Sequence, residues 1–153
     1  MKKETTVANL IGTLVGPTIA VAAGGISNSM MPFVLGDKAY FGMPFEQVGR
    51  EEGNILFWAY LSATVLTPLL GYLYDIVGRF WSIIPAVLVL SFVLSVIHLS
   101  APNLTLFIIY RSVMACLVKI IECNPLVVDY VKSESRGLAM AFVTLGIVIG
   151  ELL

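Results

Sequence analysis

The stretch that decides the fold is Gly71-Tyr-Leu-Tyr-Asp75-Ile-Val-Gly78-Arg79-Phe80, a short charged turn between two uncharged segments. No Asp, Glu, Lys, Arg or His occurs from Gly53 to Tyr74 or from Phe80 to Ile97. A helix needs about 20 apolar residues to cross the hydrocarbon core of a bilayer. The two segments therefore predict membrane-spanning helices that reverse direction at this turn.

The composition predicts the same class of protein for the whole chain. Hydrophobic residues make up 58% of the sequence and charged residues 12%, against about 25% charged in a typical soluble domain. We therefore expect an all-α fold, a polytopic transmembrane helix bundle in contact with the lipid bilayer. A net charge of −1 disfavours a nucleic-acid partner. Because there is no zinc-ligand spacing, no nucleotide-binding loop and only one His, we expect no enzyme activity, catalytic residue, metal site or cofactor.

Long hydrophobic segments, of which three are uncharged over about 17 residues or more, predict five spans. Four of them cover residues 7–31, 54–74, 80–101 and 104–128, and an incomplete fifth covers residues 137–153. Residues 35–53 are expected to form a charged loop between the first two spans. A secretory signal is an alternative reading of the start, with Ala20-Val-Ala22 as a cleavage site. The uncharged run continues well past that site, which favours a retained first span.

Three patterns predict which faces of the spans are packed. Small residues recur every fourth position in the first span, at Gly12, Gly16, Ala20 and Gly24, and such a ridge lets helix backbones approach closely in lipid. The second span carries the hydroxyl residues Tyr60, Ser62, Thr64 and Thr67, and is expected to be a packed interior helix. The third span is the most purely aliphatic, so we expect it to face lipid.

The fourth span carries charge within it, at Arg111, Lys119 and Glu122. At about 100° per residue, Glu122 lies about 20° from Arg111 and about 60° from Lys119 around the helix, so all three share one face. Each charge costs roughly 2.5–3.5 kcal/mol at mid-helix. That face must therefore contact protein or a watery cavity.

Two interpretations of these charges remain open. Lys119 and Glu122 at i,i+3 could form a structural ion pair, or they could contribute to a binding site. Arg111 has no carboxylate one turn away in its own helix, so it needs a partner from another helix or from a ligand. Intramembrane ionisable residues are functional candidates by default. We expect Arg111 to bind an anionic group of a small solute with Lys119 assisting, and Asn28 to line the cavity or to bond between helices.

The turn resembles the signature between the second and third helices of the major facilitator superfamily, Gly-x-Leu-Ala-Asp-Arg-x-Gly-Arg-Lys. Gly71, Leu73, Asp75, Gly78 and Arg79 match it. The stretch Asp129-Tyr-Val-Lys-Ser-Glu-Ser-Arg136-Gly137-Leu-Ala-Met-Ala is similar to the loop between helices four and five of that family. The resemblance implies the first four helices and part of the fifth of a family that normally has twelve, that is, a partial N-terminal half of its fold.

The family resemblance also implies roles for these residues. In the family, such charges form a network that latches the outward-open state. Arg79 is expected to pair with Asp129, and Asp75 with Arg136 or with a helix N-terminus in the second half. Gly71 and Gly78 are expected to allow close approach and an unusual turn. The family's Arg-x-x-x-Gly pattern becomes Arg111-Ser-Val-Met-Ala115 here, which disfavours drug–proton antiport.

The expected function is therefore part of a secondary active transporter that works by alternating access, with an anion as the favoured class of small solute. The rest of the carrier would come from a C-terminal half or from partner membrane subunits. The alternative is a non-transporting, degenerate subunit that packs in a larger membrane complex. Lys and Arg counts predict the N-terminus on the cytoplasmic side: five on that side, at Lys2, Lys3, Arg79, Lys132 and Arg136, against two on the other, at Lys38 and Arg50.

Overall fold

The computed structural model describes residues 7–122 and 131–152, and within them the chain is all-helical. Of these described residues 89% are helical and none forms a strand, which confirms the expected all-α class. The helices are α1 (Val7–Gly36), α2 (Phe45–Val77), α3 (Arg79–Val96), α4 (Leu104–Glu122) and α6 (Arg136–Leu152), with short 3-10 helices at Ile97–Ser100 and Ser133–Ser135.

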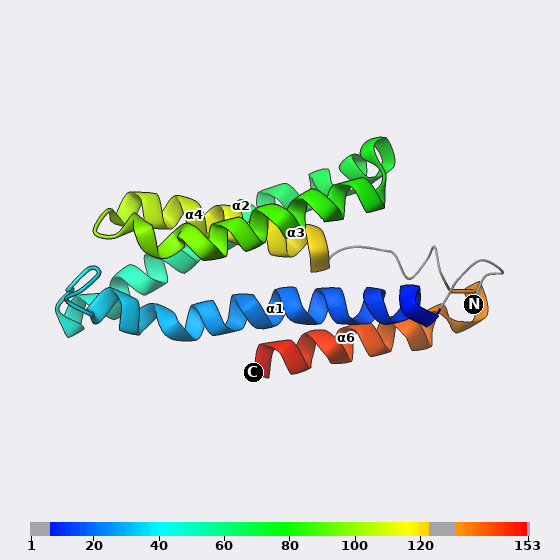
Figure 1. Ribbon diagram of the computed structural model, residues 1–153, viewed down its shortest axis with the longest axis horizontal. Coiled ribbons are helices and arrows are strands. Elements are labelled where there is room, and N and C mark those ends of the chain that lie inside the picture. The colour runs from blue at the N-terminus through cyan, green and yellow to red at the C-terminus, as the bar shows by residue number, and fades with distance from the viewer. Residues whose placement is uncertain (1–6, 123–130, 153) are drawn as a thin grey trace.

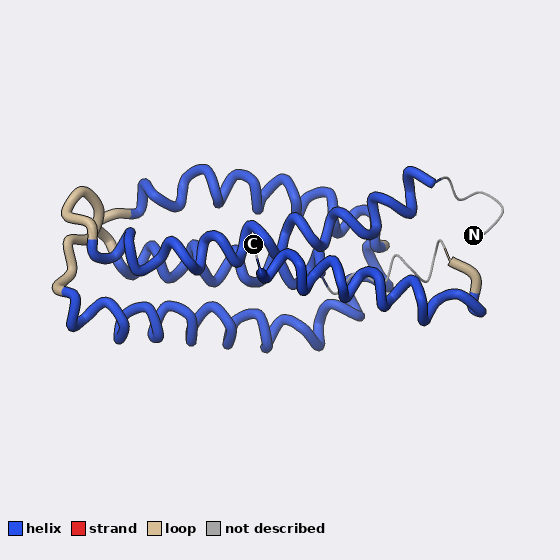
Figure 2. Tube along the Cα trace, turned by 90° about the horizontal axis from the view of Figure 1, so that it is seen from below, coloured by secondary structure: helices blue, strands red, loops and turns tan. Residues whose placement is uncertain are grey.

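Four of the helices, α1 to α4, are long and apolar enough to cross a membrane. They run up and down along one long axis, with α4 packed against α1, α2 and α3 (Figure 1). Helix α6 packs against α1. The same lengthwise arrangement is visible from below in Figure 2. The start of α1, the turn between α2 and α3 and the start of α6 all lie at one end of the molecule (Figure 1).

Helix α2 begins earlier than expected, at Phe45. The predicted loop over residues 35–53 is therefore wrong for its second half, because the charges from Glu46 to Glu52 lie on the first two turns of this helix. Pro44 precedes it with extended dihedrals (φ −58°, ψ 141°), and Glu46 suits the positive end of the helix dipole. At 33 residues the helix is about 50 Å long, against a hydrocarbon core of about 30 Å. The charged turns can therefore extend beyond the core.

The turn between α2 and α3 consists of Gly78 alone, which ends one helix and precedes the next. Its dihedrals (φ 86°, ψ 147°) fall in a region that is essentially restricted to glycine. The backbone N–H of Gly78 donates to the carbonyl oxygen of Tyr74, 3.1 Å away. Ser82 also bonds to this turn, because its hydroxyl donates to the Gly78 carbonyl oxygen at 2.9 Å. The unusual dihedrals expected for this glycine are confirmed.

Two small apolar clusters hold the helices together. One joins α1, α3 and α4 through Ala20, Leu90 and Met114. The other lies near the opposite end of α1, where Met31, Leu35, Val48, Ile55 and Phe107 are buried together. Most large apolar side chains of α3 are exposed instead, among them Trp81, Leu88 and Phe92. An apolar exposed face is what a lipid-facing helix requires.

Helix α1 packs against α6 and α4, but three of the four small residues in its ridge have no described neighbour in close contact. A Cβ atom added at Gly12, Gly16 or Gly24 would meet no described atom within 4 Å. Ala20 is buried, with 4% of its surface exposed, so only this member of the ridge is tightly packed. The predicted close approach is therefore wrong at the three glycines.

The hydroxyl residues of α2 also do not mark a packed interior face. Tyr60, Thr64 and Thr67 are exposed, and Ser62, Thr64 and Thr67 donate to carbonyl oxygens one turn earlier in their own helix, at 2.7–2.9 Å. Such local bonds satisfy a hydroxyl without any neighbouring helix. The buried stripe of α2 consists mainly of apolar residues: Val48, Ile55, Ala59, Ala63, Leu70 and Tyr74.

Candidate binding cavity

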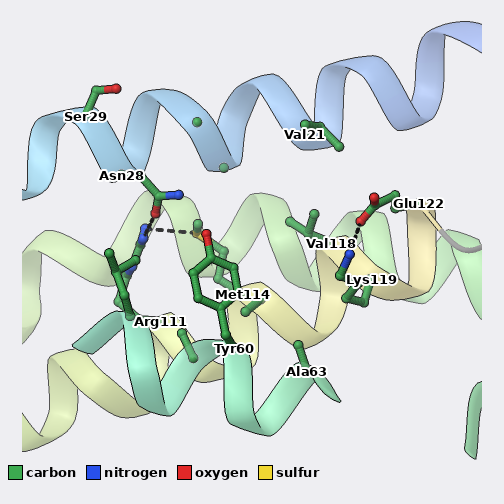
Figure 3. A pocket seen from close by; sticks show the side chains of 15 residues that line it. Val21, Asn28, Ser29, Tyr60, Ala63, Arg111, Met114, Val118, Lys119 and Glu122 are labelled. Atoms are coloured by element: carbon green, nitrogen blue, oxygen red, sulfur yellow. Dashed lines mark hydrogen bonds and ion pairs between the residues drawn. The ribbon is translucent and has the colours of Figure 1, made fainter. Parts of the chain in front are cut away.

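A cavity of about 380 Å³ lies between α1, α2 and α4 (Figure 3). This volume is within the range of small-molecule sites, about 300–1,000 Å³. Most of its lining is apolar or small, and the charged side chains come from α4 alone. The residues around it are Val21, Gly24, Gly25, Asn28, Ser29, Leu56, Ala59, Tyr60, Ala63, Arg111, Met114, Ala115, Val118, Lys119 and Glu122.

Arg111 is the most deeply buried charge on this cavity, with 3% of its surface exposed. It lies on the inward face of α4 with Phe107 and Met114, one turn apart on either side. The helix begins with a cap at Asn103, whose side-chain oxygen accepts a bond from the Leu106 N–H at 3.1 Å. Capping at Asn103 helps fix where α4 starts, and hence which of its residues face inward.

The guanidinium of Arg111 is held by α1. Its two terminal nitrogens donate to the hydroxyl of Ser27 and to the side-chain oxygen of Asn28, and Figure 3 shows the bond to Asn28. One of them also lies 3.9 Å from the sulfur of Met114. Its Nε is buried and has no hydrogen-bond partner in the described chain. The hydrogen-bonding capacity of this buried cation is therefore incompletely used.

The charge of Arg111 is not balanced by any carboxylate of the described residues. Its acceptors, a hydroxyl and an amide oxygen, are both neutral. Removing a charge from water without an opposite charge costs several kcal/mol, so a buried guanidinium of this kind favours the arrival of an anion. The cavity gives such an anion access to the α1 and α4 walls beside Arg111.

Lys119 and Glu122 line the same cavity further along α4. The Lys119 Nζ lies 2.7 Å from a carboxylate oxygen of Glu122, as an i,i+3 ion pair. Both side chains are partly exposed, at 37% and 22%. The ion pair expected from the i,i+3 spacing is therefore formed, and it borders the cavity; a contribution of Lys119 and Glu122 to binding stays a prediction.

Asn28 likewise combines two expected roles. It bonds α1 to α4 through Arg111 and it lines the cavity. Sequence reasoning missed two further residues, Ser27 and Tyr60. Ser27 accepts a bond from Arg111, and the polar run Ser27-Asn28-Ser29 inside an apolar span was the available signal. Tyr60 borders the cavity from α2, and in the sequence it follows Phe57 and Trp58 with nothing that marks it as a site residue.

The residues of the predicted charge network are described only in part. Asp75 is exposed near the end of α2, and no ion pair joins it to Arg136 within the described chain. Arg136 is half-buried at the start of α6. Asp129 and the side chain of Arg79 lie outside the described residues, so the predicted Arg79–Asp129 pair stays a prediction. Gly71 is helical and exposed, and a Cβ atom there would meet no described atom within 4 Å, so close approach is not seen at this residue.

The geometry above is what identifies the site. It combines a cavity between three helices, a buried guanidinium on one wall and an ion pair at the far end of the same helix. Comparison with protein-family models, curated proteins and solved structures finds no match to this chain. The function must therefore be inferred from these residues.

Proposed function

We propose that the chain is part of a secondary active transporter of the major facilitator type, which moves a small anionic solute across a membrane by alternating access. Four helices of sufficient length and apolarity surround or support one cavity. Transporters place their substrate sites between helices rather than on the outer surface. The remaining wall of the carrier comes from further chain or from partner membrane subunits.

The observation that carries the proposal is the burial of Arg111 beside the cavity with only neutral acceptors. Intramembrane cations are costly and usually mark ion or substrate paths. A carboxylate or phosphate group at this position would receive charge-assisted hydrogen bonds, which are about twice as strong as neutral ones. Arg111 therefore binds the anionic group of the solute, with Asn28 positioning the guanidinium from α1.

The turn at Gly78 supports the transport mechanism rather than the binding step. Its glycine-only dihedrals join α2 and α3 without a loop, which places the end of α2 directly beside the start of α3. Asp75 is exposed at this end of the molecule, where it is accessible to a partner from another bundle. In the proposed cycle, charges at this end hold one of the two access states and separate in the other.

Arg111→Ala tests the proposal in the native protein that carries this sequence, reconstituted in proteoliposomes. We expect uptake of the transported anion at subsaturating concentration to fall about tenfold or more, since one charge-assisted contact is worth about 1.5–3 kcal/mol. Arg50→Ala is the matched control, because Arg50 is an exposed Arg on the first turns of α2, paired with Glu51 at 2.8 Å and remote from the cavity lining. It should leave uptake unchanged.

Unchanged uptake of every candidate anion by the Arg111→Ala protein would refute the role of Arg111. Failure of the unmodified protein to move any solute, together with stable membrane partners that co-purify with it, would favour the alternative. In that case the chain is a non-transporting subunit of a larger membrane complex.

A further inference from the structure

The three charged side chains on the cavity wall add up to a single positive charge. Arg111 contributes one unbalanced positive charge, while Lys119 and Glu122 are paired at 2.7 Å. No other described residue that lines the cavity is charged. A ligand with one negative charge would therefore neutralise this wall, whereas a dianion would leave one negative charge uncompensated.

The charges are separated along α4 by an apolar stretch. Arg111 and Lys119 are eight residues apart, which is about 12 Å along the helix axis. Met114, Ala115 and Val118 line the cavity between them. Figure 3 shows Arg111 and Asn28 at one end of the cavity, and Lys119 and Glu122 at the other.

Apart from Tyr60 of α2, the facing walls are apolar or small in the same region. Helix α2 contributes Ala59 and Ala63, and α1 contributes Val21 with Gly24 and Gly25. A Cβ atom added at Gly24 would meet no described atom within 4 Å, so this wall leaves room for a ligand. Burying apolar surface here is worth roughly 25 cal/mol per Å², which an inorganic anion such as phosphate cannot gain.

From this arrangement we infer the substrate class, an inference that rests on the proposed function: the cavity takes a monocarboxylate with an extended apolar body. The carboxylate binds Arg111, and the apolar body lies along Met114, Ala115 and Val118. Lys119 is not a second anion-binding cation, because Glu122 already neutralises it. This revises the assisting role that the sequence suggested for Lys119.

Three probes of equal chain length separate the contributions of charge and apolar body: octanoate, suberate and 1-octanol. Saturable binding is measured by equilibrium dialysis at neutral pH on the native protein in nanodiscs, with empty nanodiscs as the reference for lipid partitioning. We expect octanoate to bind about tenfold more tightly than suberate or 1-octanol, the factor of one charge-assisted contact. Equal or tighter binding of suberate, or saturable binding of none of the probes, would overturn the inference.

Two substitutions sharpen the measurement. Arg111→Ala should remove the preference for octanoate over 1-octanol while leaving 1-octanol binding intact, which also reports that the cavity is still folded. Glu122→Gln removes the one negative charge among the described cavity residues, which makes the net charge of this wall more positive by one, and should raise suberate binding relative to octanoate severalfold. Glu51→Gln breaks an ion pair away from the cavity and should leave the ratio unchanged. An unaltered ratio in the Glu122→Gln protein would contradict the assignment of Lys119.

The binding and flux measurements test the substrate class and the transport function separately. Selective octanoate binding without flux across proteoliposomes would retain the substrate class and reject the proposed transporter. Flux of anions with no preference for octanoate over suberate would retain the transporter and reject the monocarboxylate assignment.

Discussion

Two regions of α4 accommodate charged side chains between helices in different ways. Arg111 is almost fully buried and is held by Ser27 and Asn28 of another helix. Lys119 is partly exposed and is paired with Glu122 of its own helix. The contacts of Arg111 leave its positive charge unbalanced beside the cavity, whereas the pairing with Glu122 balances the charge of Lys119. The contrast teaches that a binding site is indicated by the charge that the fold leaves unbalanced rather than by the number of charges.

The largest expected effect comes from the interhelical region. Asn28→Leu removes the amide acceptor of a buried guanidinium and should lower the free energy of unfolding by about 1.5–3 kcal/mol. The measurement is unfolding of the native protein in mixed micelles with increasing denaturing detergent. Ser29→Ala, at the neighbouring exposed residue, is the control and should change little. A negligible change in the free energy of unfolding for Asn28→Leu would contradict the claim that Arg111, unlike Lys119, depends on contacts with another helix.

An intermediate effect on the free energy of unfolding is expected where α2 contacts the Lys119–Glu122 end of α4. The hydroxyl of Tyr74, a buried residue of α2, donates to the carbonyl oxygen of Ile120 at 2.5 Å. Ile120 lies between Lys119 and Glu122, so this bond anchors the ion-pair end of α4 to α2. Tyr74→Phe should cost about 0.6–1.5 kcal/mol, the range for hydrogen bonds between membrane helices.

The same mixed-micelle unfolding measures this change. Tyr72→Phe is its matched control, since Tyr72 is 71% exposed two residues earlier on α2. A loss as large as that of Asn28→Leu would mean that the second region also depends mainly on an interhelical contact.

The smallest effect is expected for the ion pair itself. Glu122→Gln should reduce the free energy of unfolding by only about 0.3–0.5 kcal/mol, because partly exposed i,i+3 pairs are weak. The loss should shrink as salt is added, since screening weakens the pair in the unmodified protein. If Glu122→Gln lowered the free energy of unfolding more than Tyr74→Phe does, the ion pair would stabilise the fold more strongly than its partial exposure predicts.

Much of the helical architecture could be predicted from local signals. Hydrophobic segments of membrane length predicted α1 to α4, and the glycine at residue 78 predicted the turn that its dihedrals confirm. The sequence did not predict the start of α2 at Phe45, because the charges from Glu46 to Glu52 are typical of a loop between two spans. A helix longer than the hydrocarbon core can carry such charges on its outer turns, so charge alone did not mark its end.

The sequence by itself determined that α4 has one polar face and that Lys119 and Glu122 lie within pairing distance, because both follow from the helical repeat. Only the tertiary structure decided which neutral groups hold Arg111, since Ser27 and Asn28 are more than 80 residues away in the chain. It also decided that Gly12, Gly16 and Gly24 of α1 have no described atom in close contact, and that Gly24 borders the cavity, whereas Ala20 is packed in the core. Helix periodicity specifies which residues share a face, but the packing of separate helices specifies what that face meets.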